Sequence, residues 1–168
     1  FVARAQKDFN ERNSYLGSIF TATNRNLDGN FSELHKAAYT GGIDFRHAWR
    51  DRRYYFEGNA IVSHVLGSAE AIENTQRSIT RLFQRVDATH VEVDATRTSL
   101  TGSGGRIETG KQGGGNWRFN AGFVWRSPEL ELNDIGFLRQ TDEITQSSEI
   151  KYLWQVPTKI YRSIELQL

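Results

Sequence analysis

The sequence of 168 residues contains no cysteine, which excludes disulfide frameworks, thiolate metal sites and cysteine nucleophiles. It also contains no methionine, so we expect a processed product or a segment of a longer protein. No apolar run reaches the roughly 18 residues that a membrane-spanning helix needs. Basic residues number 21 and acidic residues 20, so no excess of positive charge points to nucleic acid as a partner.

Proline is scarce as well, with two residues, whereas the chain has 15 glycines and 12% aromatic residues. Mean hydropathy is only −0.59, so the chain combines many aromatic residues with a polar overall composition. Proline cannot donate to a strand ladder, and its scarcity favours long hydrogen-bonded strands joined by turns. The length suits a single domain over residues 1–168, or a piece of a larger one.

The strongest pattern is an alternation of apolar and polar residues with a period of two. Between Tyr39 and Trp49 the odd positions are mostly aromatic or aliphatic, and the even positions include Asp44 and Arg46. This alternation predicts a strand with one apolar and one polar face. It recurs, clearly or weakly, in residues 1–8, 14–24, 54–66, 98–110, 117–126, 130–142, 149–156 and 160–168. We therefore predict eight to ten strands in an all-β, antiparallel up-and-down meander.

Residues 69–86 fit two structures. Ile72, Ile79, Phe83 and Val86 lie on one face of a helix that Ser68 could cap, and residues 76–86 could equally form a strand.

The predicted connections differ in length at the two ends of the sheet. Residues 10–13, 51–53 and 111–116 make short turns, whereas residues 25–38 and 67–96 make long connections. Short turns at one end and long loops at the other are typical of outer-membrane β-barrels. A soluble up-and-down barrel remains an alternative, with the apolar face lining its interior.

Aromatic residues tend to bracket the apolar faces. Tyr39 and Trp49 enclose a span of roughly 26 Å along a membrane normal, close to the apolar band of a barrel. Trp117 and Trp125 enclose about 20 Å on a second strand. A soluble core would more often hold its largest rings centrally. We predict that the interfacial aromatic residues are Tyr39, Trp49, Trp117, Trp125 and Trp154.

The polar face predicts a cluster of charges in a barrel lumen, consisting of Asp44, Arg46, Arg118, Arg126, Asp134, Arg139, Asp142 and Glu143. The same residues could be the solvated outer face of a soluble sheet. The segment from Asp134 to Glu143 admits two interpretations. It could hold a carboxylate pair for general acid–base work on a glycan, or ion pairs that anchor a loop, which we favour.

The sequence predicts no catalytic residue, no cofactor and no metal. The four histidines lack the spacing of a metal site. His47 and His64 could face each other across a hairpin, more simply as a packed pair than as metal ligands.

Three stretches resemble a known family: YTGGIDFRHAWRDRRYYFEG (39–58), RTSLTGSGGRIETGKQGGGNWRF (97–119) and WRSPELELNDIGFLRQTDE (125–143). They are similar to the barrel part of large Bacteroidota outer-membrane proteins, a family of unknown function often fused to a carbohydrate-binding family-nine-like module. The likeness spans about residues 16–162 and brings no established active site.

The resemblance implies a transmembrane β-barrel, or a contiguous part of a larger one, in the bacterial outer membrane and cell envelope. It implies a scaffold, channel or transport element, with glycan or nutrient handling by analogy with the fused module. The expected partners are the lipid bilayer, the remainder of a larger barrel chain or an envelope complex, and glycans. A soluble ligand-binding barrel and a membrane-associated hydrolase acting on glycans remain open alternatives.

Overall fold

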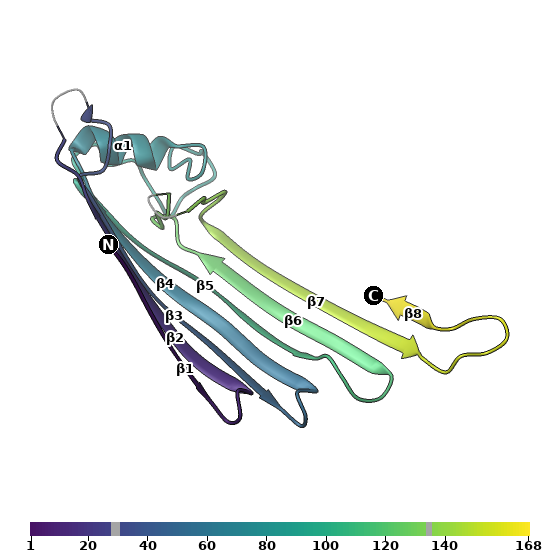
Figure 1. Ribbon diagram of the computed structural model, residues 1–168. Helices are drawn as coiled ribbons and strands as arrows, with labels where there is room; N and C mark the ends of the chain where they lie inside the picture. The colour runs from purple at the N-terminus through teal and green to yellow at the C-terminus, as the bar shows by residue number, and fades with distance from the viewer. Residues whose placement is uncertain (28–30, 134–135) are drawn as a thin grey trace.

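The computed structural model describes residues 1–27, 31–133 and 136–168, and the described chain is a long curved β-sheet with one α-helix (Figure 1). The elements are β1 (Val2–Phe9), β2 (Ser14–Asn24), β3 (Ala37–Trp49), β4 (Tyr54–Leu66), α1 (Ala69–Arg77), β5 (Ser99–Lys111), β6 (Trp117–Arg126), β7 (Glu143–Trp154) and β8 (Ile164–Gln167).

The strands form one sheet in the order β1 to β8, and every neighbouring pair is antiparallel. This confirms the all-β antiparallel meander, with eight strands in the described residues. The sheet is open: in the described part of the chain, β1 pairs only with β2, and β8 only with β7. The final strand begins at Ile164, later than the alternation from residue 160 predicts.

The predicted short turns all lie at one end of the sheet, far from α1 (Figure 1). The β1–β2 turn places Asn10, Glu11 and Arg12 at positive φ, and the β3–β4 turn does the same with three consecutive residues from Arg50. Gly114 and Gly115 supply the positive φ angles of the β5–β6 turn, which glycine adopts without steric cost. The β7–β8 connection, residues 155–163, also lies at this end (Figure 1).

The helix begins where predicted and ends early. Ser68 is its N-cap, and its hydroxyl accepts a 3.0 Å hydrogen bond from the backbone N–H of Ala71. Helical structure stops at Arg77, so both the helix to residue 86 and the alternative strand are wrong. Leu82 turns the chain at a φ of +50° and leaves Val86 fully exposed. No helix in the described ranges is long and apolar enough to cross a bilayer.

The predicted strand in residues 130–142 is also wrong, because the described residues of this segment form a loop on the sheet. Leu130 and Leu138 are buried. The backbone N–H groups of this segment bond to side chains or to loop carbonyls and not to a strand ladder: Glu131 donates to the Ser63 hydroxyl, Leu138 to the Asn133 side chain and Thr141 to the Thr80 carbonyl. These bonds satisfy buried backbone groups of the segment without a neighbouring strand.

The small apolar core lies at the end of the sheet that carries the long connections. Ile72 of α1 packs with Ala38, Val65 and Leu100, which come from β3, β4 and β5. These three strand residues share the polar side of the sheet, so α1 covers one end of that side.

Candidate functional site

One side of the sheet, which we call the apolar face, collects most of the large apolar residues of the strands. The register aligns Leu16, Phe45, Gly58, Ile107 and Phe123 in one row across five strands. Residues directly opposite each other in antiparallel strands point to the same side. The apolar face is nevertheless exposed. Its exposed large side chains include Leu16, Phe20, Ile43, Phe56, Val62, Ile107, Phe119, Ile150 and Leu166.

Aromatic rings gather on the apolar face at the short-turn end. The ring of Trp49 stacks on Tyr54, with 5.8 Å between centroids. Tyr152 packs edge to face against both Trp117 (4.8 Å) and Trp154 (4.5 Å). Trp49 and Trp154 end their strands and Trp117 begins β6, so three of the five predicted interfacial aromatic residues share this end.

The other two predicted interfacial aromatic residues lie towards the long-connection end. Tyr39 is near the start of β3, and its hydroxyl donates a 2.8 Å hydrogen bond to Asn24. Trp125 is next to the end of β6. The register places Trp125 in the row of Ile43, four residues along β3 from Tyr39, so these two rings do not share one row of the sheet.

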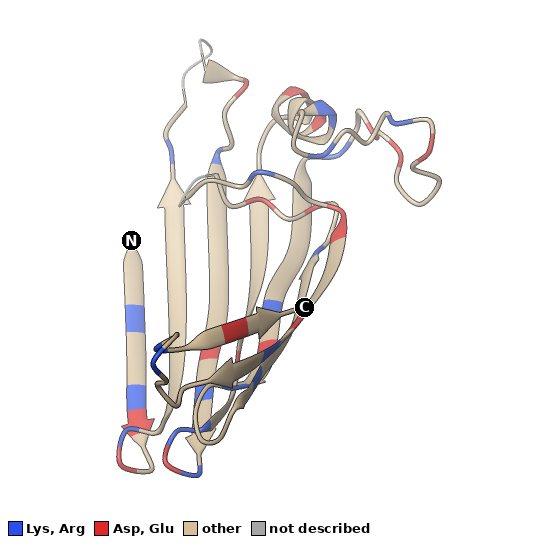
Figure 2. Ribbon diagram, turned by 90° about the vertical axis from the view of Figure 1, so that its right-hand side faces the viewer, with Lys and Arg blue, Asp and Glu red and all other residues tan. Residues whose placement is uncertain are grey.

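The opposite side, which we call the charged face, is the concave side of the sheet, and Figure 2 looks into it. Arg46 pairs with Glu57 at 2.6 Å, and Arg126 pairs with Glu143 directly across β6 and β7. Arg4 of β1 reaches Asp44 of β3 at 2.9 Å. Most of these side chains are half-buried, so the concave curvature shields charges that hydrogen-bond to one another.

A hollow of about 370 Å³ lies along the charged face of β1 to β5. Its charged and amide lining consists of Arg4, Asp44, Glu57, Asn59, Arg106 and Glu108. Glu108 accepts from both Tyr55 and Arg106. The predicted lumen cluster omitted Arg106 and Glu108, although they alternate with Ile107, because the many glycines and threonines around them weaken the periodic signal.

The remaining residues of the predicted charge cluster do not meet at one point. Arg118 donates 2.8 Å and 3.4 Å hydrogen bonds to the carbonyls of Gly115 and Gly114 and so closes the β5–β6 turn. Arg139 lies exposed in the β6–β7 connection. Asp134 is outside the described residues. Asp142 and Glu143 are adjacent in the chain, but different cations hold them.

Asp142 fastens the β4–β5 connection to the start of β7. Its carboxylate lies 2.5 Å from the guanidinium of Arg85 and 2.9 Å from Nε2 of His90. Burial by itself would raise the pKa of Asp142, but the hydrogen bonds from His90 and Arg85 outweigh it and hold the pKa below its usual value. This arrangement fits a loop anchor, the simpler of the two sequence interpretations.

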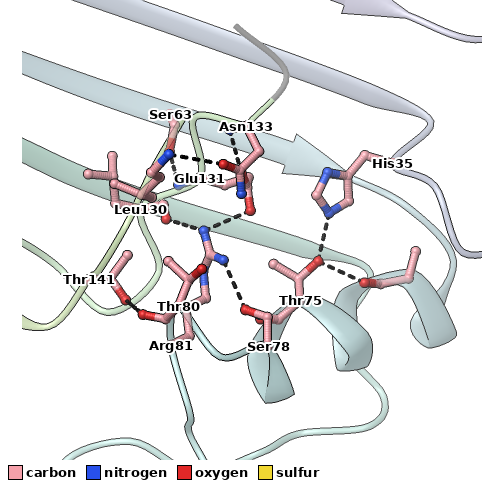
Figure 3. A network of polar contacts seen from close by, with 12 residues as sticks. His35, Ser63, Thr75, Ser78, Thr80, Arg81, Leu130, Glu131, Asn133 and Thr141 are labelled. Carbon is pink, nitrogen blue, oxygen red and sulfur yellow. Dashed lines mark hydrogen bonds and ion pairs between the residues drawn. The ribbon is translucent and has the colours of Figure 1, made fainter. Parts of the chain in front are cut away.

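A buried ion pair, not predicted from the sequence, joins two of the long connections (Figure 3). Nη2 of Arg81 lies 2.7 Å from Oε2 of Glu131, and their side chains are only 1% and 3% exposed. Arg81 also donates to the Leu130 carbonyl and to Ser78, and Glu131 accepts a 2.6 Å bond from the N–H of Asn133. Burial lowers the pKa of Arg81, which Glu131 partly restores.

The two histidines of the predicted hairpin do not face each other. His47 lies opposite Phe56 and is hydrogen-bonded to Ser14 at 2.7 Å. His64 lies opposite Tyr39 and bonds to Thr101 at the same distance. The pair was mispredicted because the register of β3 and β4 places them at opposite ends. Across the described residues, no three His, Asp or Glu side chains gather as a metal site would require.

Comparison with known proteins relates the whole sheet to one family. No curated protein and no solved structure matches the chain. A family model described as a domain of unknown function, DUF5916, matches residues 5–168, which takes in all of β2 to β8, the long connections and most of β1. The match covers almost the entire chain, and the protein therefore belongs to the DUF5916 family.

Proposed function

We propose that this chain is a membrane-embedded β-sheet of the bacterial outer membrane, part of a barrel that serves as a scaffold, channel or transport element. One observation carries the proposal: the apolar face is convex and exposed, whereas the charged face is concave and shielded. On β3, Ile43 of the apolar face is 55% exposed, whereas the side chain of its neighbour Asp44 on the charged face is 20% exposed. Water-soluble sheets bury the apolar side.

The convex surface has the properties of a lipid-facing band. Exposed large apolar side chains extend from β1 to β8 without a covering layer in the described residues, and contiguous exposed apolar surface marks an interaction with protein or membrane. Trp49, Trp117 and Trp154 gather at the short-turn end, as aromatic rings do in a girdle at a membrane interface. The half-buried ion pairs of the concave side fit a water-filled lumen, where charges can pair and hydrogen-bond.

The two open edges support a larger barrel. Phe1 and Ala22 exchange both backbone hydrogen bonds, at 2.8 and 2.9 Å. In an antiparallel ladder the alternate residues then direct their N–H and C=O groups outwards. On β1 these are Val2, Arg4, Gln6 and Asp8, without a strand partner on that side in the described chain.

Such an edge cannot remain unpaired in lipid, because each unsatisfied backbone group costs several kcal/mol there. We therefore propose that further strands, from the remainder of a larger barrel chain or an envelope complex, pair with β1 and β8. Glycans or other nutrients are proposed solutes only by analogy with the carbohydrate-binding module that similar proteins carry.

Membrane fractionation tests the proposal. The chain should stay with outer-membrane lipids after washing with high salt and alkali, and it should require detergent for extraction. A soluble ligand-binding barrel is the competing function, and it would bury its apolar side. A folded chain that remains in solution without detergent would contradict a lipid-facing band.

A further inference from the structure

The long connections fold back onto the charged face. We use the term cover for α1 together with residues 78–83 and 127–133. Ile72 is completely buried against β3, β4 and β5. At Gly102 of β5, an added Cβ would lie only 2.1 Å from the backbone nitrogen of Leu130. The main chain at residues 129 and 130 therefore rests directly on β5, whereas α1 packs on the sheet through the side chain of Ile72.

The two halves of the cover are held together by the buried Arg81–Glu131 pair (Figure 3). The backbone of Glu131 also attaches the cover to the strands, because its N–H donates a 2.9 Å hydrogen bond to Ser63 of β4. A buried charge is costly when its partner is lost. Breaking the Arg81–Glu131 pair should therefore loosen both halves of the cover together.

Polar groups surround this pair. A hollow of about 330 Å³ lies beside it, and its lining includes Arg25, His35, Asn74, Thr75 and Asn133. The Thr75 hydroxyl donates to the Ala71 carbonyl at 2.9 Å, so its oxygen accepts the 2.8 Å hydrogen bond from Nε2 of His35. Hydrogen-bonding groups of both signs line this hollow and suit a small hydrophilic molecule. Beyond the cover, the charged face is uncovered and forms the 370 Å³ hollow described above.

We propose that the cover is the constriction that limits the size of hydrophilic solutes passing along the charged face, and that Arg81 and Glu131 are positioning residues that hold it. This inference rests on the proposed function, in which the charged face lines a water-filled path. Its test therefore needs one measurement that is independent of conduction and one that is not.

The independent measurement is thiol labelling. These 168 residues contain no cysteine, so Leu100→Cys adds one thiol to them, in the space beneath Ile72. In the membrane assembly that contains the chain, this thiol should react slowly. Adding Glu131→Gln should accelerate labelling by roughly tenfold or more, because Arg81 then remains buried without a counter-charge.

Two variants control for general destabilisation. Glu73→Gln breaks the exposed Arg77–Glu73 pair of the same helix, which has a similar distance of 2.8 Å, and should leave the labelling rate within about twofold of the parent. The double variant Arg81→Met/Glu131→Leu removes both charges and should label slowly again. Fast labelling in this double variant, or in Glu73→Gln, would overturn the role of the buried pair.

The second measurement is osmotic swelling of proteoliposomes in neutral sugars and in polyethylene glycols of increasing size. Glu131→Gln should admit solutes that the parent and Glu73→Gln exclude. An unchanged size limit despite fast labelling would overturn the constriction and leave the proposed conduction intact. No swelling in any inserted variant would contradict the conducting function itself, and the constriction with it.

Discussion

Arg4 on β1 and Asp44 on β3 form a 2.9 Å ion pair although β2 lies between their strands. Gly17 of β2 makes this contact possible, because a Cβ at this position would lie 2.6 Å from a carboxylate oxygen of Asp44. Because Gly17 has no side chain, the side chains of Arg4 and Asp44 can meet over β2 on the charged face. The edge strand is thereby tied to the sheet by a side chain as well as by its ladder.

Replacing Gly17 by alanine should displace the Asp44 carboxylate and release Arg4. The matched control is Gly41→Ala, since a Cβ there meets nothing within 4 Å. Alanine in a strand gains roughly 0.5–1 kcal/mol over glycine. We expect this gain in stability for Gly41→Ala. In Gly17→Ala the loss of the Arg4–Asp44 ion pair should cancel the gain, because an exposed ion pair contributes up to about 1 kcal/mol.

Hydrogen exchange measures this difference. The backbone amides of β1 should exchange faster in Gly17→Ala than in Gly41→Ala, whereas the amides of β5 should be unaffected. Equal exchange of β1 in both variants would mean that the Arg4–Asp44 pair does not hold the edge strand.

Arginine substitutions on the apolar face should show a dependence on depth. Phe45 and Phe123 lie in one row near the middle of the face, so Phe45→Arg or Phe123→Arg should cost about 2–4 kcal/mol at a bilayer midplane. Trp49→Arg and Trp125→Arg should cost only about 0–1 kcal/mol apart from lost ring anchoring, because the proposed membrane placement puts both residues nearer an interface.

Folding titrations in lipid vesicles provide these free energies. Arg46→Ala and Arg118→Ala serve as controls, because both side chains are on the charged face and should alter conductance or local pairing more than insertion. A soluble barrel would make arginine severely destabilising at all four aromatic positions. A flat profile between Phe45 and Trp49 would therefore contradict the assignment of the girdles.

Gly102→Ala should lift the cover from β5. The added Cβ meets backbone atoms of residues 129 and 130, which cannot rotate away as a side chain can. Overpacking of this kind costs about 1–3 kcal/mol. Limited proteolysis within residues 127–133 should be faster than in the parent, and Gly41→Ala should leave it unchanged. Equal proteolysis in all three chains would show that this close approach does not fix the cover.

The Asp142 anchor should weaken only in acid. Because the folded pKa of Asp142 is depressed, its stabilising contribution is complete above the ordinary pKa of 3.8 and disappears as pH falls through the lower folded value. The protection of the amides of residues 85–90 from hydrogen exchange, relative to the unfolded chain at the same pH, should therefore fall at low pH. In Asp142→Asn the protection of these amides relative to the unfolded chain should be low and should not change with pH over that range. Asparagine tolerates the positive φ of 54° found here, so strain is not introduced.

The sheet was largely predictable because its information is local. Strand β2 occupies the predicted residues 14–24, and β6 the predicted residues 117–126. Alternation with a period of two marks a strand whatever it pairs with. The short turns follow from neighbouring residues as well, and the Ser68 cap identified the correct first residue of the helix.

The loops over the charged face were not predictable in the same way. The apolar residues Leu130 and Leu138 led to the prediction of a strand. An apolar side chain gives the same sequence pattern whether it belongs to a strand or to a loop that packs on a sheet. The helix stops at Arg77, where the sequence pattern would continue to Val86, because the chain turns to bring Arg81 to Glu131. These residues are far apart in the sequence, and no local pattern relates them.

The sequence by itself determined the strands, their alternating faces and the two ends of the sheet, because each depends on residues that are close neighbours in the chain. Alternation says only that the faces differ. Only the tertiary structure decided which face is exposed, since the curvature of eight paired strands makes the charged side concave and the cover occupies one end of it. It also decided which charges meet, because pairs such as Arg4–Asp44 and Arg81–Glu131 require strand register and loop packing to bring distant residues within bonding distance.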